Sequence, residues 1–217
     1  MITNPYFTTK LGTTIILHPH QMNNKIYLNL KKNLELKTLN KCFNKYGYIV
    51  KIIEILKYED AIIEAENVNA SATFSLEFSC KICLPMKNMV IICQIQKFNK
   101  LLMTATNGPI STIITHNRIN SSVFFKDNNN NIRYKNKNGE SKLLGPQEFI
   151  KVTIQTVKFF DGDEKITTIG FLNDIADEKD IEMYYSDMYR ETNVIEHNKF
   201  IAMYETENTG AVETEEI

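Results

Sequence analysis

The 217-residue sequence has no tryptophan, no long apolar run and no leader-like start. Its apolar stretches are far shorter than the roughly 20 residues of a membrane-spanning helix, so we expect no membrane partner. The first ten residues, MITNPYFTTK, lack the charged-then-apolar pattern of a secretory signal peptide. We therefore expect an intracellular protein in a reducing compartment, where the four cysteines are thiols and not disulfides.

The motifs of several enzyme and cofactor classes are also missing. The sequence contains no glycine-rich phosphate-binding loop, and nothing in it recommends a Ser/His/Asp or Cys/His assembly, although its four scattered histidines leave one open. His18 and His20 have a spacing at which two side chains can share a metal ion, but a turn and a helix start explain them more simply. The acidic turn 161–164 resembles a cation loop only superficially, because hairpin chemistry accounts for it. We expect no cofactor, no metal ion and no catalytic residues.

Three of the four cysteines lie close together, and Cys80 and Cys83 have the C-x-x-C spacing of many metal and redox sites. However, residues 74–84 alternate strictly between apolar and polar, which is the pattern of a half-buried strand. Residues three apart on a strand point to opposite faces, so we expect Cys80 to face the core with Ile82 and Cys83 to share the other face with Lys81. No second pair completes a tetrahedral set. We predict that these thiols serve as small apolar side chains.

Charge is distributed unevenly, although the net formal charge is −1. Residues 1–160 contain 21 Lys or Arg against 10 Asp or Glu, a balance of +11, and residues 161–217 contain 4 against 16, a balance of −12. A basic body favours a polyanionic partner. The alternative is a solvated surface followed by a disordered acidic tail. Asn, Lys and Ile are all abundant, as AT-rich coding DNA would produce, so part of the lysine excess can be drift.

The first half of the chain mixes strand and helix patterns. β-Branched and aromatic residues predict a strand over 6–17. Pro19 suits a helix start, and apolar residues at every fourth position predict an amphipathic helix over roughly 20–38. A second strand, entered through Gly47, is expected over 45–56. This order of elements indicates an α/β segment.

The chain after Pro85 is rich in short strands. The segment 126–142 is polar, Asn-rich and basic without an apolar period, so it is predicted to be a loop. Asp-Gly between two alternating runs predicts a hairpin. Five strands are the number found in a small barrel such as an OB-fold. They are expected at 89–98, 101–105, 111–116, 150–160 and 165–172.

We therefore predict an α+β protein in three parts. An N-terminal α/β domain over 1–84 precedes an OB-fold barrel over 85–176, and an acidic C-terminal extension covers 177–217. Within the extension, residues 177–204 could form an acidic helix, whereas 205–217 has the composition of disorder.

A series of short motifs runs along residues 6 to about 175. No single motif is specific, but their order and spacing resemble the seventh subunit of RNA polymerase II and its counterpart in archaeal RNA polymerase, which form the larger member of the polymerase stalk. The motifs are Leu17-His18-Pro19, Cys42, Lys45-Tyr46-Gly47-Tyr48, the strand with Phe74, Leu76 and Phe78, Leu84-Pro85 with Lys87, Asn99-Lys100, Gly108-Pro109 and Ile169-Gly170.

The sequence departs from this family at several positions. Lys87-Asn88-Met89 stands where the family usually has Lys-Gly-Glu, Leu102 replaces a glycine, and a Glu expected near Thr106 is missing. Met103 and Thr104 stand where aromatic residues are common, and stacking of a base on an aromatic ring contributes about 1–3 kcal/mol. These losses weaken the expectation of tight RNA binding on that face. They indicate a divergent copy, for which a large DNA virus or an AT-rich protist is a natural source.

The resemblance implies a non-catalytic stalk subunit that docks on the polymerase core near the clamp and contacts nascent single-stranded RNA. Its partners would be RNA polymerase core subunits and a smaller stalk subunit covering the junction of the two domains. Lys45, Tyr46, Gly47 and Tyr48 would form the core-facing tip, or, alternatively, a tight strand entry in which both tyrosines pack. The location would be the nucleus of a cell, or the virion or cytoplasmic factory of a virus.

The predicted barrel carries a set of basic and aromatic residues that would contact RNA. They would attract phosphates without reading bases, so binding should weaken steeply with salt. The alternative is a solvated lysine-rich rim. The competing function is a free-standing OB-fold RNA-binding protein, such as a translation or processing factor, which would not need the motifs of residues 17–48. The RNA-contacting residues are Lys97, Phe98, Lys100, His116, Arg118, Lys126, Arg133 and Lys135.

Overall fold

The computed structural model describes residues 2–59, 61–63, 67–99, 102–127, 132–135 and 141–185. The chain divides into two compact units, Met1–Ile175 and Ala176–Ile217. In the second unit, residues 178–185 are helical. The predicted continuation of this helix to 204 and the predicted disorder of 205–217 lie outside the described residues.

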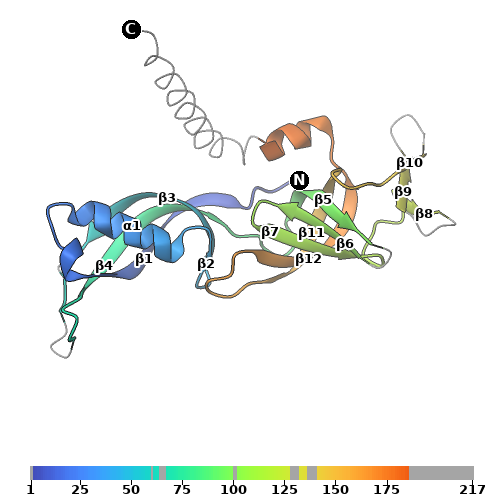
Figure 1. Cartoon of the computed structure of the whole chain (residues 1–217). Helices are drawn as coiled ribbons and strands as arrows, with labels where there is room; N and C mark the ends of the chain where they lie inside the picture. Colours follow the sequence, from blue (N-terminus) through green and yellow to red (C-terminus); the bar gives the residue numbers. More distant parts are fainter. Residues whose placement is uncertain are drawn as a thin grey trace, which may run out of the picture. The chain divides into compact units, whose positions relative to one another are not determined.

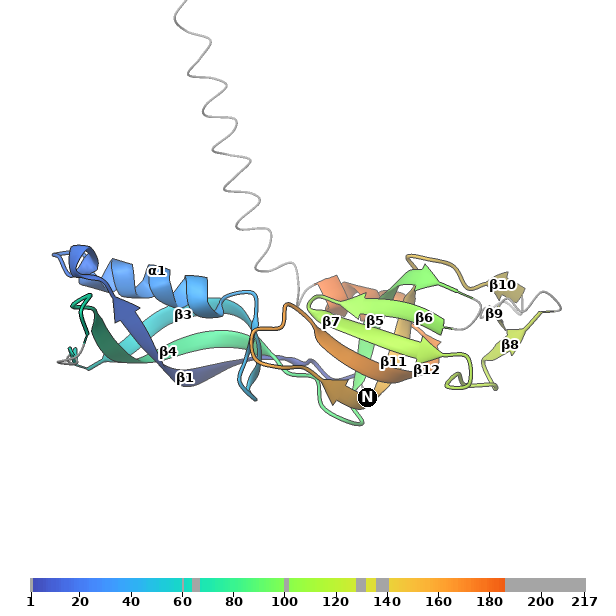
Figure 2. The ribbon, with the colours of Figure 1, turned by 60° about the horizontal axis from the view of Figure 1, so that its bottom comes forward.

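The first unit begins with an antiparallel sheet in the order β1-β4-β3-β2, and we call it the N-terminal sheet. Helix α1, Ile26–Thr38, covers one face of this sheet (Figures 1 and 2). Leu30 and Leu34 of the helix are fully buried, so the helix contributes its apolar side to the N-terminal core. The strands are β1 (Tyr6–Leu17), β2 (Cys42–Phe43), β3 (Gly47–Tyr58) and β4 (Ala72–Cys83).

The alternation predicted for residues 74–84 is present in β4. Phe74, Leu76 and Phe78 are buried in the N-terminal core, while Ser75 and Glu77 between them are exposed. The register with β1 sets apolar side chains opposite each other on the same face of the sheet, as period-two side-chain orientation requires.

The helix begins later than its periodicity predicts. Pro19–Gln21 form a single 3-10 turn, η1, and α1 starts only at Ile26. The side chain of Asn23 interrupts the path between them, because its Oδ1 accepts a hydrogen bond from the Lys25 N–H at 2.9 Å. Asn side chains compete with helical hydrogen bonding in this way, and the predicted start near residue 20 is therefore wrong.

Five further strands close into a barrel in the order β11-β12-β7-β6-β5, with β12 parallel to β7 and the other pairs antiparallel. The predicted five-stranded barrel is thus present, and it is consistent with an OB-fold. The barrel strands are β5 (Val90–Phe98), β6 (Leu102–Asn107), β7 (Ile110–Thr115), β11 (Phe149–Lys158) and β12 (Ile166–Ile175).

The segment predicted as a loop over 126–142 contains strands, so that prediction is wrong in part. An antiparallel three-stranded sheet, here called the small sheet, connects β7 to β11 (Figure 1). Its formation has a clear cause, because Phe124, Ile132 and Tyr134 project into the barrel core and are at most 7% exposed. The strands are β8 (Phe124–Lys126), β9 (Ile132–Lys135) and β10 (Ser141–Leu143).

Two separate hydrophobic cores result, and the cysteines are distributed between them. Cys80 lies in the N-terminal core, whereas Cys83 and Cys93 lie in the barrel core. All four cysteines are free and buried. The prediction that Cys80 and Cys83 face opposite sides of one strand is therefore confirmed, and β4 is shared by both cores.

Candidate functional surfaces

The chemistry of the described residues does not assemble a metal or thiol site. In that part of the chain, no group of three or more His, Cys, Asp or Glu side chains converges. Burial raises the pKa of the Cys80 thiol to about 11 and the pKa values of Cys83 and Cys93 to about 12, so these thiols stay protonated at neutral pH. The rings of His18 and His20 stack with their centroids 5.8 Å apart. The candidates for function are therefore surfaces.

The four residues predicted to dock on the polymerase core follow β2 and open β3, but they point in different directions. Lys45 and Tyr46 are exposed, and the Tyr46 ring stacks on Phe43 with centroids 6.2 Å apart. Gly47 is buried, and Tyr48 packs against the barrel core. The structure thus places half of the predicted set on the surface and half at the junction between the N-terminal sheet and the barrel.

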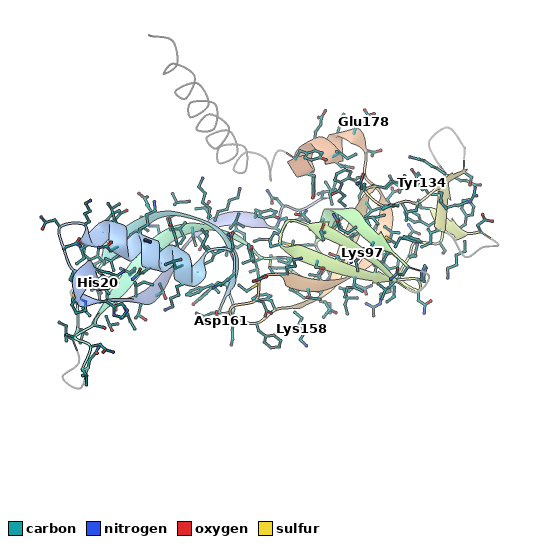
Figure 3. All side chains as sticks on the ribbon, in the orientation of Figure 1. His20, Lys97, Tyr134, Lys158, Asp161 and Glu178 are labelled. Atoms are coloured by element: carbon teal, nitrogen blue, oxygen red, sulfur yellow. The ribbon has the colours of Figure 1, made fainter. Side chains whose placement is uncertain are left out.

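The turn between β11 and β12 forms this junction together with β2. The Cys42 N–H donates to the Asp163 carbonyl oxygen at 2.7 Å, and the Gly162 N–H donates to the Cys42 carbonyl oxygen at 2.8 Å. The Asn44 N–H donates to Asp161 Oδ1 at 2.7 Å. Burial first, and then the Asp163 and Asp161 carboxylates, raise the pKa of the Cys42 thiol to about 11. Figure 3 labels Asp161 in this turn.

The N-terminal end of β1 adds further contacts to the junction. The Tyr6 hydroxyl donates to Asn107 Oδ1 at 2.9 Å, and the Asn107 Nδ2 donates to the Ile92 carbonyl oxygen at 2.7 Å. The Thr3 N–H donates to the Val90 carbonyl oxygen at 2.8 Å. Burial is the largest cause of the raised pKa of Tyr48, followed by the nearby Cys42 and Glu164. Hydrogen bonds to three places in the barrel, at Val90, Asn107 and residues 161–163, therefore tie the N-terminal part of the chain to the barrel.

This junction limits where the barrel can bind nucleic acid. In OB-folds, the loops after the first and fourth strands and the face of the second and third strands bind oligonucleotides. Here the loop after the fourth barrel strand, which contains Asp161–Asp163, is bound to β2 and its following turn. This loop is therefore occupied by contacts within the protein and is not open to an oligonucleotide.

The outward face of β6 and β7 offers neither rings nor cations in its described residues. Thr104, Thr106, Ser111 and Ile113 alternate with buried neighbours along these strands. Gln96 of β5 donates from Nε2 to Thr106 Oγ1 at 3.1 Å, which extends the same uncharged surface. Met103 is 1% exposed and Thr104 has no ring, so neither residue offers a surface on which a base can stack.

Three of the predicted RNA-contacting residues gather at the end of β5. The rings of Phe98 and His116 meet edge to face with centroids 6.2 Å apart, and His116 Nε2 lies 3.0 Å from the Asn99 carbonyl oxygen. Lys97 beside them is exposed, and Figure 3 labels it. Lys100 lies outside the described residues. This cluster combines one cation with two partly covered rings.

The remaining predicted residues divide between two places. Lys126, Arg133 and Lys135 belong to the small sheet, whereas Arg118 follows β7 and donates from a guanidinium nitrogen to Gln155 Oε1 of β11. Arg118 is thus engaged within the barrel wall. The sequence-based reasoning missed Phe125 and Leu143 of the small sheet, which are 39% and 48% exposed. The adjacent pair Phe124-Phe125 was the available signal.

A second surface missed in the sequence runs along β3. This strand pairs with β4 through three successive irregularities, each of which inserts one extra residue. The strand consequently repeats every three residues: Ile49, Ile52 and Ile55 enter the N-terminal core, and charged residues follow at 51, 54 and 57. The inserted residues form what we call the bulge row, Val50, Ile53 and Leu56.

The bulge row is apolar and open to solvent over most of its length. Ile53 is 43% exposed and Leu56 is 40% exposed, while Val50 packs partly against the barrel core. On the side of β3 away from β4, the described strands pair with it only at Gly47 and Tyr48, through β2. Exposed apolar residues along an open sheet edge are typical of a surface that a protein partner covers.

Two known proteins are similar to this chain over most of its length. The Acanthamoeba polyphaga mimivirus protein named "Putative DNA-directed RNA polymerase subunit L376" is 35% identical over 182 residues, which are 84% of this chain and 89% of that protein. The fission yeast protein named DNA-directed RNA polymerase II subunit rpb7 is 21% identical over 150 residues, which are 69% of this chain and 86% of that protein. No family model matches the chain.

The N-terminal sheet, the closed five-stranded barrel and the hydrogen-bonded junction between them define a β-rich protein. The viral relative is 35% identical over most of both chains, and this match shows the family. The chain belongs to the Rpb7-like family of DNA-directed RNA polymerase subunits, as a divergent member similar to one from a large DNA virus. None of the helices in the described residues is both long enough and apolar enough to cross a membrane.

Proposed function

We propose that this protein is a non-catalytic stalk subunit of a multisubunit DNA-directed RNA polymerase, which docks on the core near the clamp and contacts nascent RNA. The observation that carries the proposal is the match to a viral protein named as an RNA polymerase subunit, which spans 84% of this chain. In the proposed division, residues 1–84 dock on the core, residues 85–176 form the RNA-facing barrel, and 177–217 are an acidic extension.

The docking surface in this proposal is the turn after β2. Lys45 and Tyr46 project from it, and the hydrogen bonds of the junction hold its backbone. Gly47 is buried and Tyr48 packs against the barrel core, so these two residues would hold the turn in position. A smaller stalk subunit would cover the exposed apolar side chains of the bulge row, which starts beside the barrel at Val50. Burial of Ile53 and Leu56 by a partner would contribute about 1–2 kcal/mol for each side chain.

The RNA-facing surface in this proposal has two parts. Lys97, Phe98 and His116 provide one at the end of β5, and Lys126, Arg133 and Lys135 provide the other on the small sheet. Most of these groups are cations that contact phosphates, so the affinity should fall steeply as salt rises. A polymerase subunit works where the genome is transcribed, which is the nucleus of a cell, or the factory or virion of a virus.

Affinity purification from native host extract tests the stalk assignment. We expect the tagged chain to recover the large polymerase subunits, identified by mass. The double variant Lys45→Glu/Tyr46→Ala should lose most of this recovery. Its matched control is Lys32→Glu/Tyr27→Ala, which changes one exposed lysine and one exposed tyrosine on α1 and should recover the subunits normally.

The same experiment separates the competing function. If the parent chain recovers RNA but no polymerase subunits, the stalk assignment is wrong, and a free-standing OB-fold RNA-binding protein replaces it. If both double variants lose recovery equally, docking does not depend on the turn after β2.

A further inference from the structure

The outer face of the small sheet presents a row of three side chains, one from each strand. Phe125 lies opposite Arg133, and Arg133 lies opposite Leu143. Their sequence neighbours Phe124, Ile132 and Tyr134 enter the barrel core, and successive side chains of a strand alternate between faces. Phe125, Arg133 and Leu143 therefore share the face turned away from the barrel, and we call them the outer row.

The middle residue of this row is held in place. Arg133 Nε forms an ion pair with Asp127 Oδ2 at 3.0 Å, and an Arg133 guanidinium N–H donates to Ser141 Oγ at 3.4 Å. An arginine that is already paired with a carboxylate attracts phosphate less than an unpaired arginine does. Its planar guanidinium remains a surface on which a base can stack.

The apolar members of the row are exposed, although an ordinary sheet of this size would bury them or replace them with polar residues. Phe125 is 39% exposed and Leu143 is 48% exposed. A further cation, Lys135, is exposed and lies on the same face as Arg133 in β9, whereas Lys126 is opposite Ile132 and belongs to the other face. Residues 124–143 contain five Lys or Arg and two Asp or Glu, so the region is basic.

The outer row differs in chemistry from the bulge row, which is another exposed apolar surface among the described residues. The bulge row consists only of aliphatic side chains and follows an open strand edge, which suits a protein partner. The outer row combines a ring and a restrained guanidinium with a neighbouring lysine, Lys135, and these groups together match the bases and phosphates of an unpaired strand. It also supplies an aromatic residue that the described face of β6 and β7 lacks.

We propose that the outer row is a base-stacking platform for single-stranded RNA, with Phe125 as the main stacking residue, Arg133 as a second stacking surface and Lys135 as a phosphate contact. The proposal rests on the RNA-facing role proposed above and assigns that role to particular side chains. Duplex RNA is not the expected ligand, because its bases are already stacked and only phosphates and sugars would meet the sheet.

Fluorescence anisotropy of the full chain with a labelled oligouridine of about 12 nucleotides at low salt tests this assignment, since that length is within the range of one OB-fold site. We expect Phe125→Ala to weaken binding by roughly 5- to 100-fold, which corresponds to the loss of one stacked base. Phe125→Tyr should keep the parent affinity, because it keeps the ring. The matched control is Phe7→Ala, which removes a ring that is 43% exposed on β1 and should leave RNA affinity unchanged.

A direct signature of stacking is available because the chain has no tryptophan. In Phe125→Trp, the single indole should be quenched when oligouridine is added and should not respond to a duplex of the same length. The unfolding transition of each variant, measured by circular dichroism, shows that the fold is retained.

Each outcome decides a particular point. If Phe125→Ala binds RNA as the parent does, or if the indole fluorescence of Phe125→Trp does not change, the platform is overturned while the stalk assignment stands on the recovery of polymerase subunits. If Phe125→Ala loses polymerase subunits but keeps RNA affinity, the row is a protein contact and the platform is again overturned. If the parent binds no RNA at low salt, the RNA-facing part of the proposed function fails with it.

Discussion

Gly47 shows how a residue of a family motif can be required for conformation. Its φ is +113°, and a Cβ at this position would lie 2.6 Å from the Cys83 carbonyl oxygen and 3.2 Å from the Cβ of Leu84. The β2 to β3 turn therefore approaches the end of β4 as closely as backbone allows. Any side chain here would push the exposed Lys45 and Tyr46 out of position.

We predict that Gly47→Ala lowers the free energy of unfolding by about 2–3 kcal/mol, because it combines an unfavourable φ with a close contact to backbone. Urea unfolding measures this change. Gly162→Ala is the matched control for φ alone, since Gly162 has φ +84° but nothing within 4 Å of its Cβ position. Gly145 has neither a positive φ nor an atom within 4 Å of its Cβ position, so Gly145→Ala should leave the free energy of unfolding almost unchanged. Equal losses at positions 47 and 162 would show that the close contact to Cys83 is not important.

The thiols illustrate what residue-level reasoning can and cannot predict. The alternation around Cys80 and Cys83 was sufficient to exclude a shared metal site, because strand geometry alone sends the two side chains to opposite faces. The roles of Tyr46 and Tyr48 were not predictable in the same way. Both were candidates for docking, and only tertiary contacts with the barrel distinguish the exposed ring from the packed one.

At the scale of elements, β3 departs from the alternation on which strand prediction depends. Its sequence IVKIIEILK repeats every three residues and not every two. The three inserted residues add a third direction in which side chains can point, so the strand carries a core row, a charged row and the bulge row. A strand with regular alternation would place Ile53 and Ile55 on the same face.

We predict that Ile52→Ala lowers the free energy of unfolding by about 2–5 kcal/mol, because Ile52 is 6% exposed and its truncation leaves a cavity in the N-terminal core. Ile53→Ala, one position along the strand, should cost less than about 1 kcal/mol. Chemical denaturation of the two variants side by side measures the difference. A larger loss for Ile53→Ala would refute the three-residue repeat.

Most elements were predictable, and the exceptions share a physical reason. Strands β1 and β4 and the five barrel strands have enough length for their composition and periodicity to be recognised. The small sheet was not recognised because its strands are three or four residues long, and only Phe124, Ile132 and Tyr134 reveal that they cover the barrel. The helix start was misplaced because Pro19 begins a 3-10 turn that ends at Gln21, and the Asn23 side chain then accepts a hydrogen bond from the Lys25 N–H.

At the scale of the whole molecule, the N-terminal sheet and the barrel are not independent. Strand β4 contributes Phe78 and Cys80 to one core and Cys83 to the other, within six consecutive residues. Tyr6 and Tyr48 pack against the barrel core from the N-terminal sheet. Residues 1–175 should therefore unfold together, since neither core can lose β4 without exposing the other.

This arrangement predicts a single unfolding transition. We also predict that the free energy of unfolding falls as the pH becomes alkaline. The folded state raises the pKa of Cys83 and Cys93 from 9.0 to about 12, so these thiols bind their protons more tightly when folded. Their contribution to the free energy of unfolding is fully present below pH 9. It is lost as the pH rises from 9 toward 12, by about 1.4 kcal/mol per pH unit for each thiol. Urea unfolding from about pH 7 to about pH 10.5, followed by circular dichroism and tyrosine fluorescence, measures it.

The control for this prediction is Cys93→Ala, which removes one titrating thiol and should give a shallower decline above pH 9. Two separate transitions would contradict the coupling between the cores, whereas a decline that is the same with and without Cys93 would contradict the raised pKa of its thiol.

The turn at Asp161–Asp163 determines how a mechanical force would pass between the barrel and the N-terminal sheet. Backbone hydrogen bonds join this turn to Cys42, and the Asp161 carboxylate accepts a hydrogen bond from the Asn44 N–H, so the barrel is tied directly to the residues that follow β2. In the proposed role, an RNA strand that pulls on the small sheet would therefore also pull on the turn that carries Lys45 and Tyr46. In the stalk arrangement proposed above, tension on the transcript would therefore reach the core-docking residues through these hydrogen bonds.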